Sequence, residues 1–324
     1  MSTENPINQE IKTAPEQSKR MEKSADLLRN PIRDGEIGFD KVFIQANEIT
    51  NEGNKWIINI SSEDSTVILD DKWRQSLGLI NSAIVPDIRK GDGEKKLVSG
   101  GTWIWIEDNQ GQRFLSLMRR DAGAPVDTNC LTGPAGRCGE KLSKTSVDET
   151  NQEFIFLQTE KGGETKLLAF YRDDKEKEEV VAQKLRQVGE VFGALMKKYE
   201  ETGDEKAKND AKYLVSHVRG EENIQLLKMG EVEDKGQQLD EIIMTIDGVP
   251  IDRVRGIAYM DEKNKTLEVR EVVNIKLPEG VNLPVVMDGE QWLRPTTLVA
   301  EKDLAQLKTD DLVSALRNYI EKVV

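Results

Sequence analysis

The chain has 324 residues, and its 46 lysine and arginine side chains against 59 aspartate and glutamate side chains give a formal net charge of −13. This length can bury the core of one large or two ordinary domains. The negative balance argues against broad nucleic-acid binding, which requires a basic surface. No apolar run approaches the roughly 20 residues of a membrane-spanning helix, and the first residues lack the apolar core of a signal peptide. Two cysteines cannot form a disulfide scaffold, so we expect a cytoplasmic protein.

The residues 1–35 are polar, with Pro6 and Pro15 and no apolar period, and predict a disordered or partly helical tail. The following segment, 36–98, carries short β-type runs separated by turn signals and predicts a small β-rich N-terminal region. The runs are Lys41–Ile49, Lys55–Ile60 and Thr66–Leu69. We assign the rest of the chain, 99–324, to one main domain.

The apolar pattern sharpens from Gly100 onward, where nearly continuous apolar runs predict strands that are buried on both faces. In chain order we expect strands at 100–108 and 113–121, a turn-rich loop over 122–139, a helix over 141–154, and strands at 154–160 and 165–172. Helices follow at 174–199 and 204–219, then strands at 223–229, 241–246, 255–260 and 266–277, and helix-forming segments at 301–308 and 309–324. This irregular alternation predicts an α+β fold with a mixed sheet and a helical insertion at 174–220.

Two apolar patterns each allow more than one interpretation. Trp103 and Trp105 share one strand face and could pack in the core, stack on a nucleobase or form a dimer interface. The helix over 174–199 carries apolar residues at helical spacing, which could cover a core or mediate a homodimer. These residues are Val181, Leu185, Val188, Phe192, Leu195, Met196 and Tyr199.

The chain has one histidine and two cysteines, which limits the reactions that these side chains could catalyse. The single histidine, His217, excludes sites with several histidine ligands, and its place near a helix end is typical of a structural residue. Cys130 and Cys138 have no further cysteine or histidine beside them and are not a zinc signature. Any reaction is therefore expected to depend on carboxylates.

Three carboxylates stand out in the loop and helix at 133–153, namely Glu140, Glu149 and Glu153. Glu149 and Glu153 are four positions apart, so a helix places them on one face, where their charges repel. A hard divalent cation such as Mg²⁺ relieves that repulsion, because it takes oxygen ligands. The alternative is a solvated acidic helix face.

The segment resembles a degenerate Nudix box, a pattern of Gly, five residues, Glu, seven residues, Arg-Glu-aliphatic, one residue, Glu-Glu, one residue and Gly-aliphatic. Glu140 matches the first Glu, and seven residues follow it. Asp148-Glu149-Thr150 stands at the Arg-Glu-aliphatic position, and Gln152-Glu153 stands at the Glu pair. The strand, turn and strand at 100–121 are similar to those that precede the box in the family.

The resemblance implies a Nudix-like mixed sheet flanked by helices, an α/β/α sandwich, and a Mg²⁺- or Mn²⁺-dependent hydrolase of a nucleoside diphosphate linked to another moiety. Glu149 and Glu153 would be catalytic. The metal ligands would be Glu140, Glu149, Gln152 and Glu153. Arg119 and Arg120, which end the second strand, would contact substrate phosphate.

The sequence departs from the box at four positions, which are Pro134, Asp148, Gln152 and Ile155. Asp148 replaces the Arg that braces the catalytic Glu, and Gln152 removes one negative charge. These departures favour an alternative, a Nudix-like nucleotide-binding, regulatory or scaffold protein that has lost catalysis. A third reading is an interaction protein that dimerises through the helix over 174–199.

Overall fold

The computed structural model describes residues 42–61, 68–69, 96–120, 129–138, 141–160, 162–229, 238–262, 265–288 and 296–323. The predicted tail at 1–35 lies outside these residues. Within them, no helix combines the length and the apolar character needed to cross a membrane.

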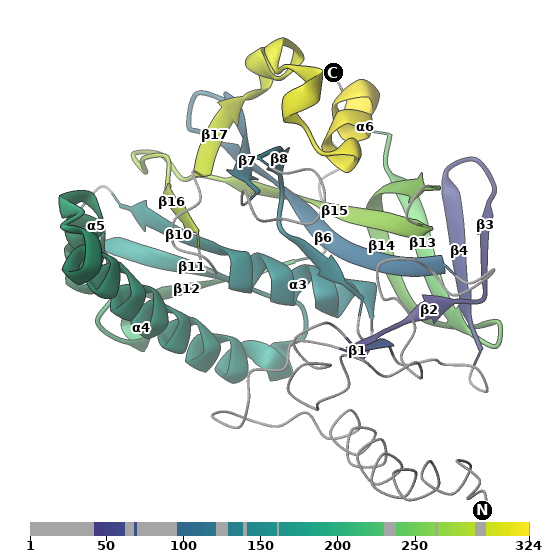
Figure 1. Cartoon of the computed structure of the whole chain (residues 1–324), viewed down its shortest axis with the longest axis horizontal. Helices are drawn as coiled ribbons and strands as arrows, with labels where there is room; N and C mark the ends of the chain where they lie inside the picture. Colours follow the sequence, from purple (N-terminus) through teal and green to yellow (C-terminus); the bar gives the residue numbers. More distant parts are fainter. Residues whose placement is uncertain are drawn as a thin grey trace, which may run out of the picture.

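The larger sheet is mixed, and its main path runs β17-β7-β6-β15-β14-β13-β4-β3 (Figure 1). In that order the strands are Thr296–Ala300, Arg113–Arg119, Lys96–Glu107, Thr266–Lys276, Val249–Asp261, Asp240–Ile246, Lys55–Ile60 and Glu48–Asn51. The pairs β6–β15 and β13–β4 are parallel. Three short strands attach to it, β2 (Gln45–Ala46) and β9 (Ala135–Arg137) on β6, and β8 (Leu131–Thr132) on β7. A separate pair joins β1 (Val42–Phe43) to β5 (Ile68–Leu69).

The strands of the 36–98 segment hydrogen-bond directly with the main sheet. β4 pairs with β13, and β2 pairs with β6. The described residues of this segment include short strands, and the assignment of 36–98 as a separate β-rich region stays a prediction.

The smaller sheet has the order β12-β11-β10-β16. Its strands are Ile224–Lys228, Thr165–Tyr171, Phe154–Thr159 and Val285–Asp288. Ile104, Ile106 and Met118 of the larger sheet share one buried apolar cluster with Phe156 and Phe170 of the smaller one. The two sheets thus pack against each other through apolar side chains, which supply the main favourable free energy of burial.

Helices cover the outer faces of both sheets, and one helix, α3 (Leu142–Glu153), contacts strands of both (Figure 1). α4 (Lys177–Thr202) and α5 (Glu205–His217) pack on the smaller sheet, and α6 (Ser314–Val323) packs on the larger one. Short 3₁₀ helices lie at η2 (Asp174–Glu176), η3 (Glu221–Asn223), η4 (Glu301–Gln306) and η5 (Thr309–Asp311). The predicted α+β fold, with a mixed sheet flanked by helices, is confirmed.

The start of the helical insertion and the junction between its two helices carry clear local signals. Asp173 and Glu176 form a reciprocal capping box at the start of η2, which leads into α4. Gly203 ends α4 with φ +71°, a left-handed conformation that side chains rarely adopt, and Asp204 then caps α5 through two backbone N–H groups.

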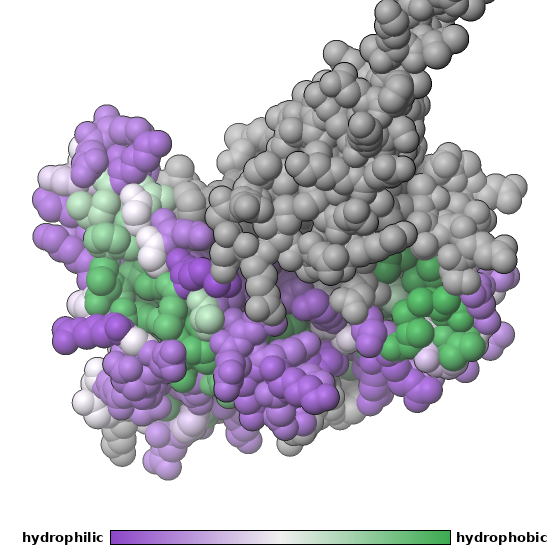
Figure 2. Space-filling view, turned by 90° about the horizontal axis from the view of Figure 1, so that it is seen from below, coloured by the Kyte–Doolittle hydropathy of each residue, from purple (hydrophilic) through white to green (hydrophobic). Residues whose placement is uncertain are grey.

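The buried face of α4 differs from the predicted apolar stripe. Val188 and Leu195 are buried as expected, but Phe192 is 37% exposed, and the polar residues Lys184 and Gln187 are buried instead. Seen from below, apolar residues gather over the α4–α5 side of the molecule inside a hydrophilic rim (Figure 2). The large apolar residues exposed on these two helices are Phe192 and Val215, and a homodimer formed there stays a prediction.

Trp103 and Trp105 are core residues. Their exposed fractions are 0% and 1%, and both contact Tyr319 of α6. Trp103 stacks on the Tyr319 ring at 5.2 Å between centroids, and Trp105 Nε1 donates a 2.5 Å hydrogen bond to Tyr319 Oη. The core interpretation of this pair is therefore confirmed, and α6 is anchored to β6 through one side chain.

Tyr319→Phe is expected to lower the free energy of unfolding by about 1–3 kcal/mol, because Trp105 Nε1 loses its acceptor in a buried site. Tyr319→Ala is expected to cost about 3–5 kcal/mol, since a cavity is added. Urea denaturation followed by tryptophan fluorescence measures both. Tyr259→Phe, at a half-buried position of β14, is the control, and equal losses for the two Phe variants would contradict the anchor.

Candidate functional site

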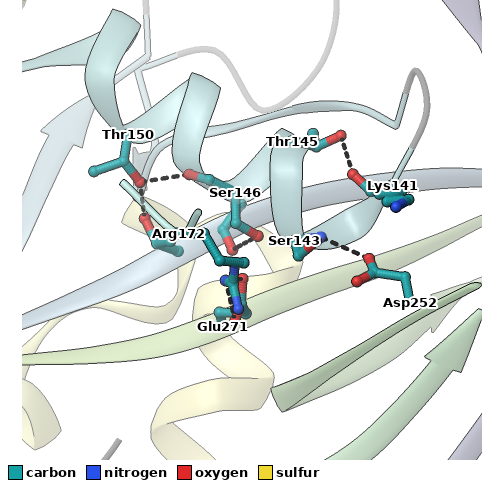
Figure 3. A network of polar contacts seen from close by, with 10 residues as sticks. Lys141, Ser143, Thr145, Ser146, Thr150, Arg172, Asp252 and Glu271 are labelled. Atoms are coloured by element: carbon teal, nitrogen blue, oxygen red, sulfur yellow. Dashed lines mark hydrogen bonds and ion pairs between the residues drawn. The ribbon is translucent and has the colours of Figure 1, made fainter. Parts of the chain in front are cut away.

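The candidate site is built on α3, whose first turn is held by β14. The first N–H groups of a helix have no partner within the helix. Asp252 Oδ2 accepts the Ser143 backbone N–H at 2.8 Å, so a carboxylate from β14 lies at the positive end of the helix dipole (Figure 3). Thr145 packs directly against Gly100 of β6, where a Cβ would lie 3.0 Å from its methyl group.

The middle of α3 is hydrogen-bonded to β6. Ser146 Oγ donates to Gly101 O at 3.2 Å, and the hydroxyl oxygens of Thr150 and Thr102 are 2.7 Å apart. Arg172, which follows β11, donates two hydrogen bonds of 2.7 and 2.6 Å to the Glu271 carboxylate of β15 beside them (Figure 3). This ion pair ties the smaller sheet to the larger one next to the helix.

Glu271 is an acidic group in an unfavourable environment, with 3% of its surface exposed. Burial raises the pKa of Glu271, while the charge and hydrogen bonds of Arg172 and a hydrogen bond with Ser146 lower it in part. The ion pair between Arg172 and Glu271 is therefore largely shielded from solvent, and the hydrogen bond between Ser146 and Glu271 connects it to α3.

Glu149 and Glu153 lie on one face of α3, as their spacing predicts, and both are buried, with 2% and 9% of their surface exposed. Glu153 Oε2 accepts the Ala135 backbone N–H at 2.9 Å. The Glu149 carboxylate lies against Gly136 so closely that a Cβ there would be 2.1 Å from Oε1. The glycine at 136 thus makes room for a carboxylate beside the backbone of β9.

The C-terminal end of α3 is held by α4 and β11. Lys184 Nζ donates to Asn151 O at 2.5 Å, to Phe154 O at 2.7 Å and to Gln187 Oε1 at 2.9 Å. Gln187 Nε2 donates to Gln152 O at 2.5 Å. The Asn151 side chain pairs with both backbone groups of Phe170 on β11, at 2.7 and 2.9 Å. These bonds satisfy the last carbonyls of the helix and fix the end that carries Glu153.

The remaining predicted residues lie in several places. Glu140 lies outside the described residues. Gln152 is half-buried beside Glu153. Asp148 forms an i, i+4 ion pair with Lys144, in which Oδ2 and Nζ are 3.6 Å apart. His217 ends α5 with Nδ1 2.7 Å from Tyr213 O, which agrees with a structural role.

The two predicted phosphate ligands lie at the end of β7. The Arg119 guanidinium donates to the backbone carbonyl of Asn129, and the Arg120 backbone N–H donates to Cys130 O at 2.9 Å. Both interactions hold β7 to the chain that returns at β8. A contact of either guanidinium with phosphate stays a prediction.

Of the predicted metal ligands, Glu149 and Glu153 are the carboxylates that the structure describes. Glu149 and Glu153 offer carboxylate oxygens, and the Glu149 carboxylate fills the place that a side chain at Gly136 would take. Over the described ranges, no group of three or more His, Cys, Asp or Glu side chains could hold a metal ion. Mg²⁺ is often held by one or two carboxylates and takes its other oxygen ligands from water and substrate phosphates. A cation at Glu149 and Glu153 therefore stays a prediction.

Sequence reasoning missed Arg137, which directly follows Gly136 on β9. Its Nη1 donates to Thr266 Oγ1 of β15 at 3.0 Å. Burial lowers the pKa of Arg137, with Arg120 and Arg270 lowering it further, while Glu268 and Asp261 raise it. Its position in the glycine-rich loop beside the acidic helix was the available signal.

No family model matches the sequence. No curated protein matches it either. Among solved structures, the MutT protein from Methanosarcina mazei Go1 is similar over 72% of this chain and 94% of its own, with 8% identity and a TM-score of 0.28. An Ap4A hydrolase from C. elegans is similar over 69% of this chain and 94% of its own, with 10% identity and a TM-score of 0.25. The Nudix hydrolase RenU from M. smegmatis is similar over 72% of this chain and 85% of its own, with 7% identity and a TM-score of 0.27. Scores this low do not establish a common fold.

Gly136→Ala is expected to destabilise the protein by about 1–3 kcal/mol, because the new methyl group overlaps the Glu149 carboxylate in a packed site. Gly189→Ala is the matched control, since nothing lies within 4 Å of a Cβ at that helical position. It is expected to stabilise α4 by up to about 1 kcal/mol. Urea denaturation measures both, and a neutral Gly136→Ala would contradict the close approach of Glu149.

Lys184 is expected to make stability depend on pH. Burial lowers the pKa of Lys184 to about 7. Between that value and the ordinary lysine pKa of about 10.4, the unfolded chain binds a proton that the folded protein does not, so stability rises with pH by up to about 1.4 kcal/mol per unit. Below pH 7 both states are protonated and this slope vanishes.

The free energy of unfolding of the wild type and of Lys184→Met, measured from pH 6 to pH 9, tests this. The wild type is expected to gain stability relative to the variant above pH 7. Parallel curves would show that Lys184 keeps an ordinary pKa. Lys197→Met, at an exposed position of α4, is the control for a change in net charge.

Proposed function

We propose that the protein is a Nudix-type pyrophosphohydrolase, which uses Mg²⁺ or Mn²⁺ to cleave a nucleoside diphosphate linked to another moiety. The observation that carries the proposal is the pair of buried carboxylates, Glu149 and Glu153, held on one face of α3 against the glycine-containing strand β9. Its support outside the structure is the sequence resemblance over 134–155, in which both residues occupy glutamate positions of the Nudix box.

The chain's own residues would bind and orient the reacting groups. Glu149 and Glu153 would hold the cation, which when bound offsets the charge that develops on a diphosphate during attack by water. The Ala135 N–H keeps the Glu153 carboxylate in its orientation, and Lys184 and Gln187 keep the helix end in place. Such preorganisation is the main source of electrostatic stabilisation in enzymes.

A second candidate function is nucleotide binding without turnover. Asp148 stands where the family has an arginine, and its ion-pair partner is Lys144 on the same helix, so this position braces neither carboxylate as an arginine would. Gln152 adds an amide in place of a second carboxylate, which leaves one negative charge fewer for a cation. Both features would weaken metal binding and slow hydrolysis.

Incubation with a panel of diphosphate compounds separates these functions. ADP-ribose, NAD, dinucleoside polyphosphates, nucleoside triphosphates and nucleotide sugars are each mixed with the protein and Mg²⁺ or Mn²⁺, and the products are resolved by chromatography. We expect metal-dependent cleavage of at least one compound, and a loss of at least about 100-fold in Glu149→Gln and Glu153→Gln, since each removes a charge at the cation. Glu190→Gln, at an exposed position of α4, is the control.

Each outcome decides between the candidates. Cleavage that persists in Glu149→Gln would overturn the assignment of this carboxylate. Absence of cleavage together with metal-dependent nucleotide binding in calorimetry would favour the second function. Absence of both cleavage and binding would exclude both functions.

A further inference from the structure

Arg137 lies on the opposite face of β9 from the carboxylate pair. A Cβ at Gly136 would enter the Glu149 side chain, so the side of residue 136 faces α3. Successive residues of a strand point to opposite faces, and Arg137 therefore extends over the other face of the larger sheet. Its hydrogen bond to Thr266 Oγ1 confirms this direction, because Thr266 lies on β15, beyond β6.

Small residues on β6 allow the guanidinium to cross that strand. Ser99 of β6 is paired with Arg137 on one side and with Glu268 on the other. Gly101 is paired in the same way with Ala135 and Arg270. Arg137, Glu268 and Arg270 therefore project from one face of three adjacent strands, with no bulky β6 side chain between them.

The local charges are unequal. Glu268 is already engaged, with Oε2 2.5 Å from Arg270 Nη2. Arg270 is 5% exposed, and its buried Nε has no hydrogen-bond partner. Arg120 and Arg270 both act on Arg137 as like charges, against Glu268 and Asp261 as opposite charges. Among the described residues, Arg137 and Arg270 are thus two guanidinium groups on one face of the sheet, and Glu268 pairs with Arg270.

The Arg137 guanidinium makes fewer hydrogen bonds with the described residues than it has N–H donors. Among the described residues its side-chain hydrogen bond goes to the neutral Thr266 hydroxyl, and it forms no ion pair within 4.0 Å. Buried or half-buried cations are ordinarily paired, because leaving water costs free energy that only an opposite charge restores. A guanidinium presents up to five N–H donors in a planar fork that matches phosphate oxygens.

We propose that Arg137, together with Arg270, forms a binding site for a phosphate or diphosphate group on the face of β9 opposite Glu149. An anion there would offset the charge of the two guanidinium groups and accept the Arg137 donors that the described residues leave unused. Arg137 is half-buried, so an anion can approach it from solvent. The site does not depend on the proposed hydrolysis, since an anion would bind whether or not the carboxylates are catalytic.

Calorimetric titration with imidodiphosphate, a diphosphate analogue with a nitrogen bridge, tests the site in the absence of divalent metal. We expect the wild type to bind with a dissociation constant below about 1 mM and Arg137→Gln to bind at least about tenfold more weakly, which corresponds to about 1.4 kcal/mol. Arg137→Lys is expected to fall between them, because it keeps the charge and loses the fork. Arg219→Gln, an exposed arginine after α5, is the control.

Two further variants keep the test decisive. Should Arg137→Gln fail to fold, Thr266→Val removes the hydroxyl that orients the guanidinium, and it too is expected to weaken binding. Glu149→Gln is expected to leave binding intact, which separates this site from the proposed hydrolase. The proposal is overturned if the wild type shows no binding at millimolar imidodiphosphate, or if the arginine and threonine variants bind as the wild type does.

Discussion

The burial of a polar helix between two sheets is the constraint on which the rest of the structure depends. Nine of the 12 residues of α3 are buried, and most of them are polar. Buried polar groups are costly unless each finds a partner. The partners come from four surrounding elements, β14, β6, β11 and α4, through Asp252, Gly101, Thr102, Phe170 and Lys184. The buried position of α3 therefore depends on all four elements.

This constraint explains why α4 buries a lysine. Lysine is almost never fully buried without partners, yet Lys184 is 1% exposed. Its three hydrogen bonds are with oxygen acceptors, two of them carbonyls at the end of α3. In its protonated form, the Lys184 ammonium group supplies three donors and places a positive charge at the negative end of the helix dipole. The helical insertion is thereby attached to the candidate site and does not merely cover the smaller sheet.

Local patterns predicted most of the elements but not the polar contacts between them. The strand Lys55–Ile60 matches the predicted run, and α3 differs from the predicted 141–154 by one residue at each end, because continuous apolar runs and turn signals are local features. The shared face of Glu149 and Glu153 followed from their spacing alone. The burial of Lys184 and Gln187 was not predicted, since apolar periodicity cannot show that these polar residues have partners on another helix. Arg137 was missed because its neighbours Glu268 and Arg270 come from a strand far along the chain.

The strand β9 separates two groups of opposite charge. Gly136 admits the Glu149 carboxylate on one face, and Arg137 carries a guanidinium to the other. The backbone of β9 lies between the Glu149 carboxylate, which comes from α3, and the Arg137 guanidinium. The two faces of this strand therefore carry charges of opposite sign. The cation proposed at the carboxylates and the anion proposed at Arg137 would thus be separate ligands, one on each face of β9.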